Sequence, residues 1–421
     1  GEYRAAIIDA KNVLLEEPGS RRARLLLGRA SIRVGDAAAA EKELTRAVEL
    51  GSEFADVAVD FGQALLLLNE FQRVLDEIAV EGVANDGEKS SILKIRGDAM
   101  LGLGETSGAR DEFVAALAIT PADPDAMLGI VSSYVAEREF MQARATLDEV
   151  LSLNNAYIPA WLTSGSLNVR TRNYDSAAEN YDQALRLADQ QSNPTAKIQA
   201  LIGLAEAHLG RKEPASAKEA VQQIDELAPD STQALFIKAR IAYAEQDWTY
   251  AVQTLLEVIR RNSNYQPAQV LLGAVHLEKG SLGQAEMYLS AAVANNPSDV
   301  NARKLLADTR LRQGRTSEAS SILGPLLGDD AKDAGALSMA ARASAGSGEY
   351  DQAAAYISQR LEDDPDNTEL KLDLAATYLF AGDTERAQSI LDGVTENTDA
   401  DSRRGATLRL LARLALSLIH I

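Results

Sequence analysis

The sequence predicts an all-α protein in which one helix–turn–helix unit recurs about every 34 residues. Three observations support this prediction: a small residue recurs at the eighth position of the unit, alanine recurs at the twentieth, and glycine or proline recurs where a helix has to end. A unit of this kind cannot bury its own apolar face, so neighbouring units must stack. We therefore expect a right-handed solenoid of antiparallel helix pairs, with about eleven full repeats and partial repeats at both ends.

The unit is clearest between residues 158 and 189. Large aromatic residues and small residues alternate there at helical spacing: Trp161, Gly165, Tyr174, Ala177, Tyr181 and Ala184. This pattern predicts a first helix, a tight turn and a second helix that approach each other closely. A bulky side chain at either small position would overpack the pair, at a cost of about 1 to 3 kcal/mol.

Aligning the chain on the small residues gives the order of the repeats. First helices are expected near Arg21, Ala55, Ser90, Pro124, Ile158, Ile198, Thr232, Gln266, Val300, Ala334 and Thr368. The twentieth position then reads Ala40, Val74, Ala109, Ala143, Ala177, Ala217, Ala251, Ala285, Ala319, Ala353 and Ala387. Such a column of alanines marks the point where the two helices of each pair come closest.

Turn residues follow the same register. Glycines fall at the fifteenth position, where a residue with positive φ can end the first helix: Gly35, Gly104, Gly280, Gly314, Gly348 and Gly382. Prolines fall at the thirty-second position, where the second helix must stop: Pro18, Pro121, Pro229, Pro297 and Pro365. Asp123, Ser231, Asp299 and Asn367 follow as N-caps of the next helix.

The register divides the chain into five segments. Residues 1–20 fit the second helix of a truncated repeat, and residues 21–189 hold repeats 1 to 5. Residues 190–197 are expected to form a lengthened loop, and one extra residue near 86–89 is expected to lengthen another loop. The loop at residues 190–197 could also join two sub-arrays. Residues 198–401 hold repeats 6 to 11, and residues 402–421 form an incomplete repeat whose last residues, 416–421, resemble non-native sequence.

Composition and charge narrow the classes of function. The formal net charge of −20 disfavours nucleic acid and anionic membranes as partners, because phosphate groups would be repelled. The absence of cysteine from this sequence leaves no disulfide framework, thiolate zinc site or cysteine nucleophile in it. No apolar run approaches the length of a membrane span, so we expect no direct membrane insertion by this stretch of chain.

Candidate catalytic and metal-binding residues are few. His208 and His276 both occupy the eleventh position of their units, where Tyr134 and Tyr378 stand in others, so we interpret them as packed helix-face residues. No residues have the spacing of a metal site or a catalytic triad. The sequence therefore predicts a protein that is not an enzyme and binds no cofactor or metal.

The spacing of the small, aromatic and turn residues resembles the tetratricopeptide (TPR) repeat. In that family the first helices line a concave groove, chiefly through positions two, five, nine, twelve and thirteen, and the groove holds a protein or an extended peptide. Carried over by register, the groove residues are Arg22, Leu25, Arg29, Ile32, Arg33, Leu66, Leu162, Val169, Phe236, Arg240, Tyr243, Val270, Leu277, Lys304 and Arg312. Two alternatives stay open: the apolar members pack against the following helix, and the basic members are ordinary solvated surface.

Several stretches are similar to one bacterial family, the TPR-repeat lipoprotein of the PEP-CTERM/exosortase sorting system. They are residues 1–12, 24–28, 40–44, 271–277 and 301–306. The resemblance implies the periplasmic side of the bacterial envelope, a lipid anchor upstream of residue 1, and a scaffold role in protein sorting linked to exopolysaccharide. The lipobox cysteine of that family is not in this sequence. The alternative function is a periplasmic scaffold of a polysaccharide synthesis or export complex, although few groove aromatics are available to stack on sugars.

Overall fold

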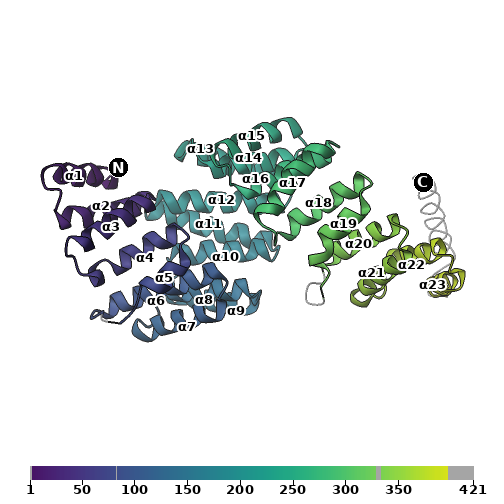
Figure 1. Ribbon diagram of the computed structural model, residues 1–421, viewed down its shortest axis with the longest axis horizontal. Coiled ribbons are helices and arrows are strands. Elements are labelled where there is room, and N and C mark those ends of the chain that lie inside the picture. The colour runs from purple at the N-terminus through teal and green to yellow at the C-terminus, as the bar shows by residue number, and fades with distance from the viewer. Residues whose placement is uncertain (1, 82, 329–332, 397–421) are drawn as a thin grey trace. The chain divides into compact units, whose positions relative to one another are not determined.

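The structure is a computed structural model that describes residues 2–81, 83–328 and 333–396. These residues form 23 α-helices and two short 3₁₀ helices, with no strand among them (Figure 1). The chain divides between Pro229 and Asp230 into two compact units. The prediction of an all-α solenoid of helix pairs is confirmed.

In the first unit, α1 precedes six helix pairs. Its helices are α1 (Glu2–Glu16), α2 (Arg21–Val34), α3 (Ala37–Glu49), η1 (Phe54–Asp56), α4 (Ala58–Leu67), α5 (Phe71–Glu77), α6 (Asp86–Leu103), α7 (Thr106–Ile119), α8 (Pro124–Ala136), α9 (Phe140–Leu153), α10 (Ile158–Arg170), α11 (Tyr174–Gln190), α12 (Pro194–Gly210) and α13 (Pro214–Leu227). Each pair packs against the next in chain order.

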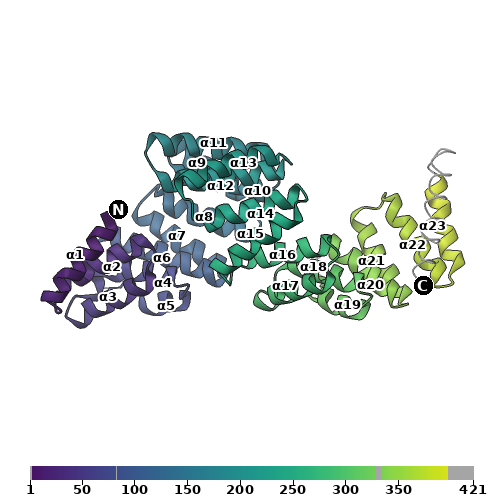
Figure 2. The same ribbon diagram turned by 90° about the horizontal axis from the view of Figure 1, so that it is seen from above.

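In the second unit, five helix pairs follow one another in the same way (Figure 2). Its helices are α14 (Thr232–Ala244), α15 (Trp248–Arg261), α16 (Gln266–Glu278), α17 (Leu282–Asn295), α18 (Val300–Arg312), α19 (Thr316–Leu323), η2 (Gly324–Leu326), α20 (Ala334–Gly346), α21 (Tyr350–Asp363), α22 (Thr368–Phe380) and α23 (Thr384–Glu396). The even-numbered helices are the first helices of the repeats, and the odd-numbered helices from α3 onward are the second helices.

The repeat register agrees with the helix boundaries. Eight of the eleven first helices begin at the expected residue, the exceptions being α4, α6 and α12. Every residue at the twentieth position, from Ala40 to Ala387, has an exposed fraction of 0%. The alanine column therefore lies at the closest approach of each pair, where no larger side chain has room.

The glycines at the eighth position face large residues of the paired helix. A Cβ added to Gly165 would lie 2.7 Å from the Tyr181 ring, and one added to Gly273 would lie 2.4 Å from Leu289. These distances are far below van der Waals contact, so the paired helices depend on the missing side chain.

The turn inside each pair has the same backbone conformation in all eleven repeats. The six glycines at the fifteenth position have φ between 72° and 82°. The other five repeats place Asn69, Arg138, Arg172, Lys212 and Gln246 there, with φ between 58° and 62°. The left-handed turn is therefore a property of the repeat, and glycine is the residue that adopts it at least cost.

The four predicted N-caps each accept a backbone hydrogen bond. Asp123 accepts from Asp125 N and Ala126 N, Ser231 from Ala234 N, Asp299 from Ala302 N, and Asn367 from Leu370 N. These bonds satisfy N–H groups that the first turn of a helix leaves without an intrahelical partner.

The two predicted lengthened loops are wrong in position. Instead of a loop over residues 190–197, α11 extends to Gln190 and α12 begins at Pro194, so only residues 191–193 connect them. The extra residue near 86–89 likewise lies in the first turn of the long helix α6. Extra residues lengthen the helices because a helix satisfies its own backbone hydrogen bonds, whereas a longer loop would not. The boundary between the units lies after repeat 6, and not at residues 190–197.

The predicted incomplete last repeat and the residues 416–421 lie outside the described residues, which end at residue 396. Across the part of the chain that the structure describes, none of the helices combines the length and the apolar character that crossing a membrane requires.

Candidate functional site

The predicted groove residues lie on first helices of both units. In the first unit, Arg22, Leu25, Arg29, Ile32 and Arg33 lie on α2, Leu66 on α4, and Leu162 and Val169 on α10. In the second unit, Phe236, Arg240 and Tyr243 lie on α14, Val270 and Leu277 on α16, and Lys304 and Arg312 on α18. The structure brings part of each set together around a cavity.

In the second unit, α14, α16 and α18 surround a cavity of about 550 Å³, which we call the aromatic cavity. It unites four of the predicted residues: Phe236, Arg240, Tyr243 and Val270. It also contains residues that the sequence analysis did not single out: Gln266, Pro267, Leu271, Ala274, Asn296, Asp299, Asn301 and Leu305. Three successive repeats thus contribute to one concave surface.

The two aromatic residues of this cavity are held rigidly. Phe236 meets Tyr265 edge to face at 5.3 Å between ring centroids, and Tyr243 meets Trp248 at 5.4 Å. Both rings are half-buried and pack against the core cluster that contains Leu255. One part of each ring therefore lines the cavity, and another part packs against the neighbouring helix. The groove prediction and its packing alternative each apply to part of the ring.

The Tyr243 hydroxyl remains a hydrogen-bond donor at neutral pH. Burial raises the pKa of Tyr243, and the negative charge of Glu278 raises it further. A neutral phenol both donates and accepts a hydrogen bond. The aromatic cavity therefore offers a polar group beside its apolar rings.

Amide side chains provide the other polar groups. Asn301 is exposed, and the structure gives its side chain no hydrogen bond within the described residues. Asn296 uses its carbonyl oxygen to accept from Ser298 N at 3.2 Å. Gln266 Nε2 donates to Asp299 Oδ2 at 3.1 Å. Arg240 already interacts within the molecule. The groups that can still form hydrogen bonds with a ligand are therefore mainly neutral side-chain amides and one hydroxyl.

Val270 and Leu277 differ in their access to the cavity. Val270 is buried but contributes to the cavity floor. Leu277 is 2% exposed and packs with Ala285 and Leu289 in the core. The prediction of Leu277 as a groove residue is therefore wrong, because its side chain points into the adjoining helix pair and has no surface for a ligand.

The predicted basic residues of the second unit are already paired. Lys304 Nζ lies 3.1 Å from Asp333 Oδ2, and Arg312 Nε lies 2.9 Å from Asp308 Oδ2. These carboxylates offset the positive charge that would attract an acidic ligand. A ligand there would have to compete with intramolecular ion pairs.

A smaller concave surface occurs in the first unit. Arg29, Ile32 and Arg33 surround a cavity of about 440 Å³ together with Tyr3, Leu26 and other residues of α1, α2 and α4. Arg29 Nε lies 2.6 Å from Asp60 Oδ2, so this guanidinium is paired.

The remaining predicted residues of the first unit are distributed over three helices. Leu25 and Leu66 are half-buried against one core cluster, and Leu162 is half-buried against another. Val169 is half-buried on α10, and Arg22 is exposed on α2. Of this set, the cavity described above brings together Arg29, Ile32 and Arg33.

Acidic residues gather between α6 and α8. Lys94 Nζ lies 2.8 Å from Asp123 Oδ2 and 3.8 Å from Asp125 Oδ2. Desolvation by the surrounding residues and the charge of Asp125 raise the pKa of Asp98 to about 6. This region therefore repels anions near neutral pH, unlike the neutral aromatic cavity.

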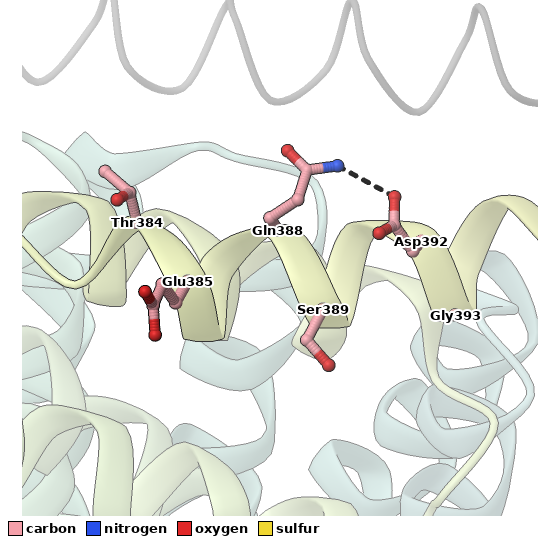
Figure 3. A pocket seen from close by; sticks show the side chains of 6 residues that line it. All are labelled: Thr384, Glu385, Gln388, Ser389, Asp392 and Gly393. Atoms are coloured by element: carbon pink, nitrogen blue, oxygen red, sulfur yellow. Dashed lines mark hydrogen bonds between the residues drawn. The ribbon is translucent and has the colours of Figure 1, made fainter.

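A polar hollow lies along α23, with Thr384, Glu385, Gln388, Ser389 and Asp392 projecting from the helix (Figure 3). Gln388 Nε2 donates to Asp392 Oδ1 at 2.7 Å. These side chains supply no apolar floor, so the hollow lacks the lining typical of a ligand pocket.

The two described histidines have different environments. His276 is buried and stacks on Tyr288 with 5.7 Å between the ring centroids. His208 Nδ1 lies 3.1 Å from Glu213 Oε2. Among the described residues, no group of His, Asp or Glu side chains is arranged to hold a metal ion.

Asn301 occupies the second position of its repeat, one of the positions that line TPR grooves. The repeat register therefore marks Asn301 as a groove residue, although it is neither an apolar residue at the fifth or twelfth position nor a basic residue. Asn296 and Asp299 lie between helices, where the repeat pattern predicts turns and caps and no contact to a ligand.

Two models of the tetratricopeptide repeat match the chain. One matches residues 128–192, 162–215 and 202–267, and the other matches residues 276–343 and 344–414. Together they cover more than half of the sequence. The chain belongs to the tetratricopeptide repeat family.

Solved structures with related folds include other TPR proteins. The APC/C hetero-tetramer Cut9–Hcn1 gives a TM-score of 0.50 at 14% identity, over 96% of this chain and 93% of that chain. A tetratricopeptide repeat protein from Parabacteroides merdae gives 0.46 at 17% identity, over 61% and 98%. Yeast Tom70 gives 0.46 at 15% identity, over 99% and 93%. No curated protein sequence matches the chain.

The likeness to Cut9–Hcn1 concerns the fold, since the identity is low. Tetratricopeptide repeat proteins are generally non-catalytic scaffolds, and their fold generally binds protein or peptide partners. In the aromatic cavity, three repeats together present apolar and hydrogen-bonding groups on one surface.

Proposed function

We propose that the protein is a non-catalytic scaffold that binds an extended segment of a partner protein in the aromatic cavity. The observation that carries this proposal is the convergence of Phe236, Tyr243 and Asn301 from two non-adjacent repeats on one cavity of about 550 Å³. The cavity follows the direction in which the repeats stack, so a chain lying along it would meet α14, α16 and α18 in turn.

The chemistry of the lining favours a peptide. An extended peptide carries an N–H and a carbonyl at every residue, and amide side chains such as that of Asn301 can both donate to and accept from them. The half-buried rings of Phe236 and Tyr243 provide rigid apolar surface for a side chain of the partner. Phosphate-rich ligands are disfavoured by the net charge of −20.

The pathway and location remain part of the proposal. On the resemblance to the PEP-CTERM TPR lipoprotein, we place the scaffold on the periplasmic side of a bacterial envelope, in protein sorting linked to exopolysaccharide. The partner would then be an envelope protein in transit. A lipid anchor upstream of residue 1 would belong to the same proposal.

A test removes polar groups from the cavity while keeping its apolar packing. The double variant Tyr243→Phe/Asn301→Ala retains the ring at position 243 and removes one hydroxyl and one amide. The control, Tyr250→Phe/Asn264→Ala, makes the same chemical change at two exposed residues that do not line the cavity. Both variants and the wild type would be used to capture proteins from a whole-cell lysate of a PEP-CTERM-encoding bacterium, followed by calorimetry with peptides from the captured proteins.

We expect the cavity variant to bind these peptides about tenfold or more weakly than the wild type, because two hydrogen bonds at about 1 kcal/mol each are lost. The control should bind as the wild type does. Equal binding by all three proteins would refute the aromatic cavity as the site. Capture of cytoplasmic proteins alone, with the cavity dependence intact, would retain the scaffold and reject the envelope pathway.

A further inference from the structure

A second cavity of the same unit, of about 350 Å³, lies between α20 and α22 and reaches down to α21. We call it the α20–α22 cavity. It shares no lining residue with the aromatic cavity. The origin and the chemistry of this cavity therefore have to be considered separately from those of the aromatic cavity.

The sequence explains why space remains there. The fifth and twelfth positions of the repeat are Ser338 and Ala345 in α20, whereas α14 carries Phe236 and Tyr243 at the same positions. The small side chains leave a gap, and Ile357 of α21 lines its base. The gap is a consequence of two residues that depart from the pattern of the other repeats.

The floor of the α20–α22 cavity is apolar. Leu337, Ala341, Ile357 and Leu370 are all buried and line it. A volume of about 350 Å³ falls at the lower end of the range of small-molecule sites. An apolar group entering this space would leave water for a preformed hydrophobic surface.

Positive charge adjoins this floor. Arg360 is half-buried, its Nη1 donates to Ser338 Oγ at 2.5 Å, and it has no carboxylate partner among the described residues. Arg342 also lines the cavity, and its Nη1 lies 3.7 Å from Asp308 Oδ1, a distance that leaves most of its donors available. The one acidic lining residue, Asp373, is already engaged within the molecule.

A half-buried guanidinium keeps part of its surface in water, and the donors that Ser338 does not use can bind an anionic ligand. Carboxylates fit this role because both of their oxygens can accept from one guanidinium. An apolar floor beside Arg360, which has no carboxylate partner among the described residues, thus matches a molecule with an apolar body and a carboxylate at its end.

The other polar groups of the cavity argue against a peptide in this position. Thr377 Oγ1 donates to the Asp373 carbonyl at 2.8 Å, and Ser338 accepts from Arg360. No amide side chain lines the cavity among the described residues, so nothing comparable to Asn301 is available for a peptide backbone. A small ligand needs no such groups beyond the guanidinium.

We propose that the α20–α22 cavity binds a small carboxylic acid with an apolar body, such as a medium-chain fatty acid, with its carboxylate on Arg360 and its chain over Ile357. This is a second ligand class for the scaffold, separate from the peptide assigned to the aromatic cavity.

The test uses the full chain and isothermal titration calorimetry with octanoate and octan-1-ol. Ala345→Leu fills the cavity with the residue that Leu311 and Leu379 provide at the twelfth position of other repeats, so the fold should accept it. Arg360→Gln removes the charge. Arg260→Gln is the matched control, because Arg260 lies on α15 and neither lines this cavity nor pairs with a residue that does. Circular dichroism checks that each variant is folded, and Ser338→Val replaces Ala345→Leu if that variant is not.

We expect Ala345→Leu and Arg360→Gln each to weaken octanoate binding about tenfold or more, and Arg260→Gln to leave it unchanged. Octan-1-ol should bind more weakly than octanoate to the wild type and should be insensitive to Arg360→Gln. The proposal is overturned if octanoate does not bind, or binds equally well to the folded Ala345→Leu variant. It is also overturned if an acetylated peptide acid ending in leucine binds more than tenfold tighter than octanoate, which would make the occupant a peptide terminus.

Discussion

Single residues set how closely the helices of this solenoid approach one another. Tyr181 is buried between two glycines: an added Cβ at Gly165 would lie 2.7 Å from its ring, and one at Gly203 would lie 2.2 Å from it. One aromatic side chain therefore fixes the distance to its own first helix and to the first helix of the next repeat. The sequence pattern predicts Gly165, but it does not predict Gly203, which faces the ring from the following repeat.

We expect Gly203→Ala to destabilise the first unit. The new methyl group would overlap the buried Tyr181 ring at a cost of about 1 to 3 kcal/mol, which outweighs the gain of about 1 kcal/mol in helix propensity. Gly283→Ala is the control, because a Cβ there meets nothing within 4 Å. Urea unfolding should show a lower midpoint for Gly203→Ala and an equal or higher one for Gly283→Ala. An unchanged midpoint for Gly203→Ala would contradict the packing described here.

The buried His276 should make the second unit sensitive to acid. Burial lowers the pKa of His276, and the positive charge of Lys279 lowers it further. The unfolded chain takes up this proton near pH 6.5, but the folded chain takes it up only at lower pH. The contribution of His276 to stability is therefore fully present above about pH 6.5 and is lost as the pH falls below that value.

Thermal unfolding at pH 7.5 and pH 5.0 tests this expectation. The fall in Tm between the two values should be smaller for His276→Gln than for the wild type, because glutamine does not titrate and all other titrating groups are shared. The same fall in both proteins would show that His276 does not carry the effect.

At the scale of the helix pair, the turn is more uniform than the residues that form it. Gln246 adopts φ of 62° between α14 and α15, although the left-handed region disfavours residues with a Cβ. Gly280 adopts φ of 72° at the same position of the next repeat without this cost. The repeat geometry thus overrides the local preference of the residue.

Exchanging the two residue types should change stability in opposite directions. Gln246→Gly is expected to stabilise the second unit by about 0.5 to 1 kcal/mol, because glycine relieves the strained backbone and the Gln246 side chain that is lost is exposed. Gly280→Ala is expected to destabilise the unit by about 1 kcal/mol. Chemical unfolding of both variants measures this difference, and changes of the same sign would argue against backbone strain as the cause.

The helix pair also shows what can be predicted from the sequence. Helix starts, the alanine column and the left-handed turns follow from steric rules that act within one unit, so the repeat pattern contains them. The cavities do not follow in the same way. Tyr243 and Leu277 both occupy the twelfth position, yet Tyr243 lines a cavity and Leu277 is buried. The difference depends on which residues the neighbouring repeats place against them, and a single unit carries no information about that.

At the scale of the whole molecule, the repeats form two compact units with their own cores. A solenoid is held together by contacts between neighbouring repeats, so its stability is distributed along the chain. Where contacts across one boundary are fewer, the parts on either side can unfold separately. The position of this boundary, after Pro229, has no signal in the repeat register, because the step from the sixth repeat to the seventh has the usual length.

Two equivalent substitutions, one in each unit, test whether the units unfold separately. Ala177 and Ala285 occupy the twentieth position of their repeats, and both have an exposed fraction of 0%. A leucine at either position would overpack the helix pair and cost about 1 to 3 kcal/mol. We expect Ala177→Leu to speed amide hydrogen exchange in residues 2–229 alone, and Ala285→Leu to do so in residues 230–396 alone, as measured by mass spectrometry. If either substitution speeds exchange equally throughout residues 2–396, the two units unfold as one cooperative array, and the overpacking strain passes from one to the other.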